Sequence, residues 1–365
     1  MSTQERKIRY AVVGAGNIAQ VAVLPAFQHA RENSELVALV SGDPEKRAEL
    51  QRRYELEAAG DYEELESILE SHRIDAVYIA TPNTEHKELA LRAARAGVHV
   101  LCEKPLAPTV RDCQEMADAC ARAAVKLMVA YRLHFEAANL KALEIVRSGK
   151  LGTATLFSSF FSHVVRAGDI RRRPEVAGGA SYDLGVYCIN AARTLFGAEP
   201  TSVLASAIEK NGTDDTLTAI LTFPGERSAQ FTVSNSVAGV SSYRIAGPEG
   251  SLRVEPAYEY AEGNELYLTV DDETSHEAFR KRDQFAPELV YFSKCVLNDL
   301  EPEPSAEEGL CDVRVIEAIL QSAKSKRLVE LEPYQRSRRP SPSQEMRKPP
   351  VSKPDTVKAP SPSTR

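Results

Sequence analysis

Positions 8–19 read IRYAVVGAGNIA, an apolar run that leads directly into a turn of the pattern Gly-x-Gly-x-x-Ala. The run predicts a buried strand, and the residues after the turn predict a helix. Between these elements, Gly14 can make the tight turn, Gly16 lets a pyrophosphate approach the backbone, and Ala19 lets the helix pack on the strand. Free N–H groups at the helix start attract phosphate. The turn therefore predicts a nicotinamide dinucleotide held by Gly14, Ala15, Gly16, Asn17 and Ile18.

Short apolar runs and helical periodicity alternate through the first third of the chain, which is the pattern of a doubly wound parallel sheet with helices on both faces. We expect strands at 8–13, 36–40, 76–80, 99–102 and 126–129. Helices are expected at 18–29, 62–71, 85–96 and 110–124, with another opened by Asp43-Pro44. This Rossmann dinucleotide-binding domain is predicted to span residues 1–130.

Strands that alternate apolar and polar residues dominate the chain after a helix expected at 136–148. Separated by Gly, Pro and Asn, they predict an open-faced, mainly antiparallel sheet with one face covered by helices and the other free for a partner subunit. The strands are expected at 153–161, 202–208, 217–223, 229–236 and 243–247, and a final helix at 306–325. We expect this α+β domain, which would bind substrate and join subunits, to span residues 131–334.

Residues 335–365 are rich in Pro, Ser, Lys and Arg and contain almost no large apolar side chains. A segment of this composition buries too little apolar surface to offset the entropy that it would lose on ordering. The sequence therefore predicts a disordered tail, with a docking arm as the alternative interpretation.

The composition is that of an ordinary globular protein, with 43% hydrophobic and 27% charged residues in a chain of 365. A formal net charge of -7 argues against a nucleic-acid partner, which would require a basic face. The six cysteines show no paired spacing, so neither a metal site nor a disulfide framework is predicted. The sequence shows neither a secretory signal nor an apolar run of membrane-spanning length. We expect a cytoplasmic protein that acts on a small molecule.

The end of the second expected strand decides which dinucleotide fits, because an acidic residue there would bind the ribose 2′-hydroxyl of NAD. Ser41 and Gly42 occupy that place, and the cations Lys46 and Arg47 follow. A hydroxyl and two positive charges suit a 2′-phosphate, so NADP is favoured over NAD. The same two cations could instead form a solvated first helical turn, with Asp43 as the helix N-cap.

The fifth expected strand ends in Cys102-Glu103-Lys104-Pro105, and ligands of such sheets lie outside the carboxyl ends of the strands. Lys104 is therefore expected to face the nicotinamide. Together with the glycine turn, with Thr81-Pro82-Asn83 and with His86, this segment resembles the glucose-fructose oxidoreductase, inositol dehydrogenase and rhizopine-catabolism (Gfo/Idh/MocA) oxidoreductase family. The resemblance extends over most of residues 7–332.

Several segments are similar to the glucose-fructose oxidoreductase branch of that family in particular. They are residues 40–42 with Glu45-Lys46, 130–135, 177–179, 183–187 and 307–314. The resemblance implies tightly held NADP, a sugar substrate, and subunit pairing through the open sheet into a homodimer or homotetramer. It also places Thr81, Pro82, Asn83, His86, Glu103, Lys104 and Arg132 at the cofactor.

Asp183 and Tyr187 stand four apart on a helix expected to end at Gly197, so their side chains share one face. The resemblance implies that Tyr187 is the catalytic acid and base. Lys104 would bond its hydroxyl or the substrate oxygen, and the lysine charge would favour the phenolate. Asp183 would orient Lys104 or a sugar hydroxyl. Arg132 would bind substrate or shape the pocket, with a structural ion pair as the alternative.

We therefore expect an NADP-dependent sugar oxidoreductase that moves a hydride between C1 of an aldose and the nicotinamide, giving an aldonolactone. A second sugar could reoxidise the bound cofactor, as the glucose-fructose branch implies, or a plain aldose dehydrogenase could release NADPH. A non-catalytic dinucleotide-sensing regulatory protein is the alternative of another class. Lys104 and Tyr187 argue against it, because a sensor needs neither side chain.

Overall fold

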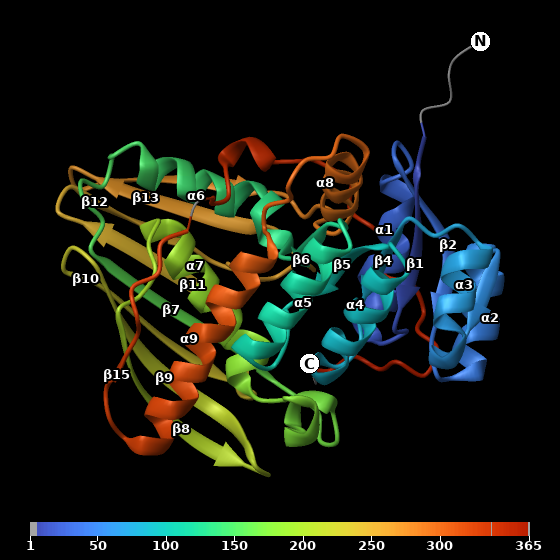
Figure 1. Ribbon diagram of the computed structural model, residues 1–365. Coiled ribbons are helices and arrows are strands. Elements are labelled where there is room, and N and C mark those ends of the chain that lie inside the picture. The colour runs from blue at the N-terminus through green and yellow to red at the C-terminus, as the bar shows by residue number, and fades with distance from the viewer. Residues whose placement is uncertain (1–5, 337, 364–365) are drawn as a thin grey trace.

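Two sheets lie side by side in the computed structural model, which describes residues 6–336 and 338–363 (Figure 1). Within this part of the chain, the first sheet has six parallel strands in the order β3-β2-β1-β4-β5-β6. The winding reverses between β1 and β4, as in a Rossmann fold, so the predicted doubly wound sheet is confirmed. Its strands are β1 (Ile8–Val13), β2 (Ser34–Val40), β3 (Ala58–Gly60), β4 (Ala76–Ile79), β5 (His99–Glu103) and β6 (Leu127–Ala130).

Helices cover both faces of this sheet because its strands are apolar on both sides. Along β1, Ala11 and Val13 belong to the core under one helical layer, whereas Tyr10 and Val12 belong to the core under the other. None of the helices in residues 6–336 and 338–363 is both long enough and apolar enough to cross a membrane. The first layer is α3 (Leu65–Ser71), α4 (His86–Arg95) and α5 (Val110–Arg122), and the second is α1 (Leu24–Ala26), α2 (Pro44–Tyr54) and α8 (Ala286–Leu297).

Helix α8, which was not predicted, brings residues from the far end of the chain onto the first sheet. Tyr10 and Ser293 share a hydrogen bond of 2.8 Å between their hydroxyls, and Asn33 donates to the carbonyl of Val290 at 2.9 Å. The helix buries apolar side chains in the same core as β1. The division of the chain into domains at residue 130 stays a prediction.

The second sheet has nine strands within the described residues, in the order β14-β13-β12-β11-β7-β10-β9-β8-β15. Neighbours are antiparallel apart from β7 and β10, so the predicted mainly antiparallel sheet is confirmed. Strands β12 to β15 were not predicted, because they are short or, like β14, mostly polar. The strands are β7 (Leu156–Val164), β8 (Ser202–Lys210), β9 (Thr213–Phe223), β10 (Arg227–Ser234), β11 (Ser236–Gly247), β12 (Gly250–Val254), β13 (Asn264–Val270), β14 (Glu273–Phe279) and β15 (Val329–Glu330).

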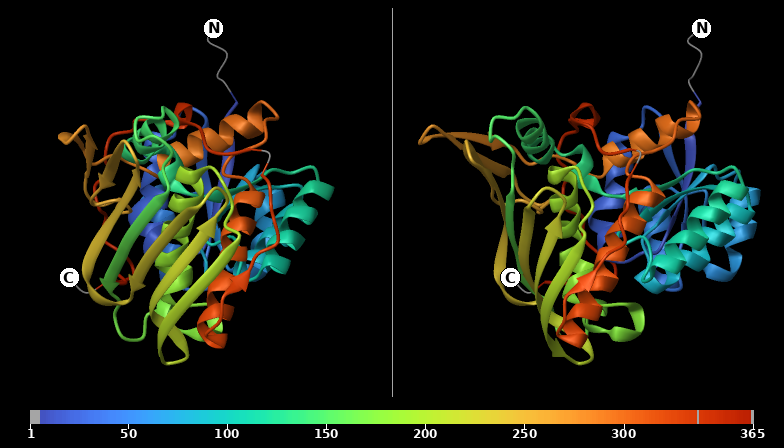
Figure 2. Two further views of the ribbon diagram at one scale, coloured as in Figure 1. Left: turned by 90° about the vertical axis from the view of Figure 1, so that its left-hand side faces the viewer. Right: turned by 60° about the vertical axis from the view of Figure 1, so that its left-hand side comes forward.

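Among the described residues, helices cover one face of the second sheet and leave the other face open. Three helices pack on the inner face: α6 (Ala137–Arg147), α7 (Val186–Phe196) and α9 (Ala306–Ser325). Figure 2, left, shows the broad sheet with no helix in front of it. Such a surface suits a protein partner, and subunit pairing through it stays a prediction. Its exposed apolar side chains include Leu156, Leu204, Ile208, Ile220, Val237 and Val240.

Helix α9 packs against both sheets. One side of it lies along β8, and another lies against α5 and β6. Gly309 permits this approach, because a Cβ atom there would lie 2.7 Å from Leu106 Cβ and 2.8 Å from Val129 Cγ2. A larger residue would push α9 away from the first sheet. The cores under the two sheets therefore form one continuous apolar cluster.

Of residues 335–365, which their composition predicts to be a disordered tail, Ser337 and residues 364–365 lie outside the described residues, and the structure gives the others a defined path. Residues 335–336 and 338–363 instead lie along both domains, and their anchors are polar. Arg336 is buried, bonds Glu303 at 2.9 Å and also contacts Glu308. Composition misses such anchors because it counts apolar residues, whereas buried ion pairs do the anchoring here.

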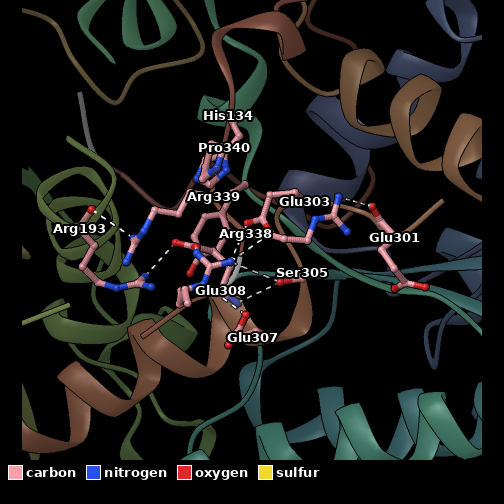
Figure 3. Close-up of polar contacts among 12 residues, drawn as sticks. His134, Arg193, Glu301, Glu303, Ser305, Glu307, Glu308, Arg338, Arg339 and Pro340 are labelled. Carbon is pink, nitrogen blue, oxygen red and sulfur yellow. Dashed lines mark hydrogen bonds and ion pairs between the residues drawn. The ribbon is translucent and has the colours of Figure 1, made fainter. Parts of the chain in front are cut away.

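A cluster of buried charges anchors the C-terminal residues. Figure 3 shows Arg193, Glu308 and Arg339 within this cluster. Arg193 of α7 is fully buried and pairs with Glu199 at 2.5 Å and with Glu308 of α9 at 2.8 Å. Asp312, one turn further along α9, contacts the same guanidinium. Arg339 shares Glu199 with it at 2.9 Å. The cluster thus joins α7, α9 and the C-terminal residues.

The Arg193→Met substitution should lower the free energy of unfolding by about 3–5 kcal/mol, because it removes the buried cation that Glu199, Glu308 and Asp312 share. Urea denaturation followed by circular dichroism measures the loss. Arg52→Gln is the matched control, since it removes an exposed pair with Glu49, and it should cost less than about 1 kcal/mol. Equal losses of stability in the two variants would show that the buried cluster contributes no more to the free energy of unfolding than an exposed ion pair does.

Candidate active site

The carboxyl ends of the parallel strands open into a cleft of about 1100 Å³ that the second sheet also borders. Ligands of open parallel sheets bind at this edge. Of the site residues predicted from sequence, Arg47 does not line the cleft. Those that do are Gly14, Ala15, Gly16, Asn17, Ile18, Ser41, Gly42, Lys46, Thr81, Pro82, Asn83, His86, Glu103, Lys104, Arg132, Asp183 and Tyr187.

The glycine turn has the shape that a dinucleotide requires. Gly14 adopts a φ of +103°, and a Cβ atom there would lie 2.5 Å from the carbonyl oxygen of Ala80, so a side chain is excluded. At Gly16 the nearest atom to an added Cβ is 4.0 Å away, which leaves the backbone open. The buried hydroxyl of Thr81 has no hydrogen-bond partner within the described residues. Bare backbone and an unpartnered hydroxyl in one cleft fit a dinucleotide, which the turn and Thr81 would hold.

The three residues after β2 that were considered for the cofactor have different roles: Asp43 caps a helix, Lys46 lines the cleft, and Arg47 stabilises the turn. Asp43 accepts the backbone N–H groups of Glu45 at 2.9 Å and Lys46 at 3.2 Å, and so caps α2 as expected. Lys46 lines the cleft together with Ser41. Arg47 instead donates to the carbonyl of Ser41 at 2.6 Å. Lys46 therefore borders the cleft and Arg47 stabilises the turn, and contact of Lys46 with a 2′-phosphate stays a prediction.

Asp183 gathers three basic side chains in the cleft. Its carboxylate lies 3.6 Å from Lys104 Nζ, 3.0 Å from Arg171 Nε and 3.7 Å from His163 Nε2. Lys104 also donates to the Asp183 carbonyl at 3.0 Å. Burial would raise the pKa of Asp183, but the charges of Arg171, Lys104 and His163 lower it to about 2. The carboxylate is therefore ionised at neutral pH and holds Lys104 in place.

Tyr187 lies on α7 directly after the short π-helix Ser181–Gly185, which carries Asp183. The Lys104 ammonium lies over the Tyr187 ring, 4.6 Å from its centroid. The phenol oxygen accepts a hydrogen bond of 3.4 Å from Arg132 Nη2. Lys104 was expected to bond either this hydroxyl or the substrate oxygen; its amine is held at the Asp183 carbonyl, and a bond to the substrate oxygen stays a prediction. Arg132 is therefore the cation beside the hydroxyl.

Arg132 is buried, and uncharged groups fix its guanidinium. It donates to the Gln284 side chain and to the carbonyl of Tyr258, and it lies 5.4 Å from the ring centroid of Tyr260. These hydrogen-bond partners carry no negative charge, and the acidic residues that act on Arg132 through space include Glu103, Glu259 and Glu288. The arrangement suits stabilisation of a phenolate.

His86 and Asn83 line the cleft but bond to the protein backbone. The His86 ring nitrogens lie 3.1 Å from the carbonyl oxygens of Thr81 and Pro105. Asn83 donates to the carbonyl of Ala177 at 3.0 Å. These contacts hold the loops that border the cleft, and direct contact of either residue with a cofactor stays a prediction.

Glu103 ends β5 beside Lys104 and accepts a hydrogen bond of 2.9 Å from the Tyr78 hydroxyl. Burial raises the pKa of Glu103, although Lys104 and Tyr78 oppose this effect. The carboxyl is thus tied to the sheet, and its contact with a cofactor stays a prediction.

Sequence reasoning missed several residues of the cleft. Arg171 stands in the run 171–173, but nothing in that run distinguishes it from Arg172, which pairs with Asp215 at 2.8 Å. Neither His163 nor the tyrosines near Arg132 carry a motif. The missed residues that line the cleft include His163, Arg171, Tyr258, Tyr260 and Gln284, and from the C-terminal residues Val351, Lys353, Ser361, Pro362 and Ser363.

A Rossmann sheet with this turn, together with a basic cleft that a second sheet completes, defines an NAD(P)-dependent oxidoreductase. Residues 8–131 match the family described as "Oxidoreductase family, NAD-binding Rossmann fold", and residues 139–253 match the "GFO/IDH/MocA C-terminal domain". The chain belongs to the Gfo/Idh/MocA oxidoreductase family.

Three proteins similar to this chain illustrate the range of the family. D-xylose 1-dehydrogenase [NADP(+)] of Haloarcula marismortui is 32% identical over 340 residues, which cover 90% of this chain and 94% of that protein. The crystal structure of aldose-aldose oxidoreductase from Caulobacter crescentus complexed with glycerol has a TM-score of 0.85 and 35% identity, and covers 89% and 100% of the two chains. KijD10, a 3-ketoreductase from Actinomadura kijaniata in complex with NADP and TDP-benzene, has a TM-score of 0.80 and 26% identity, and covers 87% and 98%.

The comparisons confirm the family but not the glucose-fructose oxidoreductase branch in particular. The relatives named above are a xylose dehydrogenase, an aldose-aldose oxidoreductase and a 3-ketoreductase. Segments such as 130–135 and 183–187 suggested that branch, and the residues of these segments that line the cleft are Ala130, Arg132, Asp183, Leu184 and Tyr187.

The Asp183→Asn substitution should lower the free energy of unfolding by about 2–3 kcal/mol near pH 7, because each unit of pKa shift corresponds to about 1.4 kcal/mol. Folding lowers the pKa of this carboxyl to about 2, so its contribution is complete above the unfolded value and is lost as the pH falls toward the folded one. The difference between the native protein and the variant should therefore shrink between about pH 5 and pH 3.

Urea denaturation at several pH values measures this dependence. Asp118→Asn, on the exposed face of α5, is the control and should change stability by less than about 0.5 kcal/mol at every pH. A difference for Asp183→Asn that stays constant with pH would contradict the ion pairing described for this carboxylate.

Proposed function

We propose that the protein is an NADP-dependent aldose 1-dehydrogenase. The observation that carries this proposal is the position of the Tyr187 hydroxyl, which lies 3.4 Å from Arg132 in the same cleft as Lys104 and the glycine turn. The similarity to a xylose dehydrogenase and to an aldose-aldose oxidoreductase supports an aldose as the substrate. Oxidation at C1 would give an aldonolactone.

The side chains of the cleft would have separate roles in the transfer of the substrate proton. Bound NADP would supply the acceptor for a hydride. Tyr187 would take the proton of the sugar hydroxyl as general base, and Arg132 would stabilise the phenolate from 3.4 Å. Lys104, above the ring, would add a second positive charge and donate to the sugar oxygen. Asp183 would keep Lys104 in that place through their ion pair.

NADP rather than NAD is the cofactor that the residues after β2 favour. Ser41 stands where an acidic residue would repel a 2′-phosphate, and Lys46 lines the same cleft as Ser41. The xylose dehydrogenase relative is named for NADP, and KijD10 was crystallised with NADP. Both relatives support NADP over NAD as the cofactor of this protein.

Transfer between two sugars without release of the cofactor is a second candidate function. The observation that favours it is the C-terminal segment, from which Lys353 and residues 361–363 line the cleft. The aldose-aldose oxidoreductase relative points in the same direction. A dinucleotide sensor has less support, because Lys104 and Tyr187 would have no task in it.

A screen of aldoses with NADP and NAD tests the proposal. A dehydrogenase should accumulate NADPH continuously when glucose or xylose is added, whereas a coupled enzyme should form aldonolactone and a reduced sugar without free NADPH. Absorbance of the reduced nicotinamide and chromatography of the sugars distinguish the two. Absence of oxidation of any aldose with either cofactor would refute both candidates.

The Tyr187→Phe substitution should reduce kcat with the best aldose by about 10²–10⁴-fold, since it removes the general base, while the Kd of NADPH stays within about twofold. Stopped-flow turnover and fluorescence titration measure the two quantities. Tyr291→Phe is the matched control, because it removes a hydroxyl that accepts the Glu303 N–H at 3.2 Å. An unchanged rate in Tyr187→Phe would overturn the role of this residue.

The Lys46→Gln substitution should raise the Kd of NADP by about 10–100-fold, because a charge-assisted hydrogen bond contributes about 1.5–3 kcal/mol. The Kd of NAD should not change, since NAD has no 2′-phosphate. Titration of both cofactors measures the ratio, with Arg52→Gln on the same helix as the control. An equal loss of affinity for NAD and NADP would show that Lys46 contacts a part of the cofactor that both dinucleotides share, and not the 2′-phosphate.

A further inference from the structure

The C-terminal segment, residues 351–363, is attached to the helices that follow the glycine turn and β2. Arg53 of α2 donates to the carbonyl of Asp355 at 2.5 Å. Gln20 and the backbone of Val357 exchange two hydrogen bonds, of 3.0 and 2.7 Å. Because Gln20 is buried, these bonds place the segment directly on the wall of the first domain.

The segment then passes the dinucleotide turn and reaches the other domain. Asn17, within the turn, donates to the carbonyl of Ala359 at 2.8 Å. The backbone N–H of Arg166, just after β7, donates to the carbonyl of Pro362 at 2.8 Å. Figure 1 shows the end of the red C-terminal trace running from beside α2 toward the second sheet. The segment therefore connects the two walls of the cleft.

These contacts coincide with the place where a dinucleotide would lie. The amide of Gln20 that holds Val357 also donates to the carbonyl of Ala15, inside the turn, at 2.9 Å. Residues of the segment line the same cleft as Gly14 and Gly16. The segment is thus built onto the phosphate-binding turn itself, and not onto a remote surface.

The composition of the segment suits this position. Pro354, Pro360 and Pro362 restrict the unbound chain, so less conformational entropy is lost when the segment lies down. Lys358 pairs with Glu45 of α2 at 2.7 Å. The attachment uses mainly backbone atoms and surface charges, which allows the segment to detach without unfolding either domain.

We propose that residues 351–363 form part of the dinucleotide-binding site and close over its phosphate-binding turn, so that NADP(H) leaves only after the segment detaches. The inference rests on the dinucleotide binding in the proposed function, but not on the identity of the sugar. Its effect is on dissociation more than on the chemical step. A retained NADPH would be available to a second sugar, as the coupled reaction requires.

Truncation after Pro350 tests the segment, because it leaves the anchors of Arg336 and Arg339 in place. The full chain and the truncated chain are loaded with NADPH and chased with excess NADP, and the loss of nicotinamide fluorescence gives the dissociation rate. The truncated chain should release NADPH about tenfold faster or more, and the Kd should rise by a similar factor. Thermal unfolding without nucleotide checks that the truncated chain is folded.

A double substitution, Arg53→Gln with Lys358→Gln, loosens the segment without shortening the chain. It should accelerate release by about two- to fivefold, and Arg52→Gln should leave the rate unchanged. If the truncated chain does not fold, this variant decides the question.

Dissociation at the same rate in the full chain and in the loosened or truncated variants would overturn the proposal. Slower release or tighter binding after truncation would overturn it as well, because the segment would then obstruct the cleft. No sugar is needed for the measurement. Failure to oxidise aldoses would therefore refute the proposed function while leaving this test intact.

Discussion

The contact between Asp183 and Lys104 is the constraint on which the candidate active site depends, because it joins the two domains inside the cleft. Lys104 comes from the end of β5, whereas Asp183 and Arg171 come from the second domain. Without the carboxylate, the cations around it would repel one another. With it, Lys104 and Arg171 are fixed in the cleft before any ligand binds, and Asp169 pairs with Arg171 as well. Cations that are held in this way suit the stabilisation of an anionic oxygen.

Much of the first domain could be predicted because its strands are buried on both faces and its turns carry glycine at places that exclude side chains. Gly14 is such a place, since its backbone conformation and the carbonyl of Ala80 leave no room for a Cβ atom. Strand β14 could not be predicted, because its residues are polar and exposed, and only its pairing with β13 makes it a strand. Local pattern and tertiary pairing thus determine different elements.

The same distinction applies to the candidate site, where some residues could be placed from the local sequence pattern and others only from the tertiary structure. Residues next to the strand ends, such as Lys104, could be placed because parallel strands deliver them to one edge. Arg171 could not, since its neighbour Arg172 has the same chemistry and a different partner, Asp215. Arg47 was assigned to the cofactor on charge alone, but it bonds the carbonyl of Ser41. Charge predicts that a partner exists, and only the fold determines which one.

Buried charges also explain why the end of the chain is ordered. Arg336 pairs with Glu303, just before α9, and with Glu308 of α9, and Arg339 pairs with Glu199, just after α7. Removal of these ions from water is costly, so their pairing favours one arrangement over others more than it adds stability. The cluster therefore fixes where the following residues begin their path toward the cleft.

The packing of α9 at Gly309 limits how the molecule can move. Since α9 lies against both β8 and β6, and one apolar cluster runs through both domains, a hinge rotation that widened the cleft would expose core side chains to water. Entry and exit of a large ligand would then require local detachment at an edge of the cleft, and not a rotation of the two domains away from each other. The rate of such a step responds to denaturant and temperature like local fraying, with a small change in exposed surface.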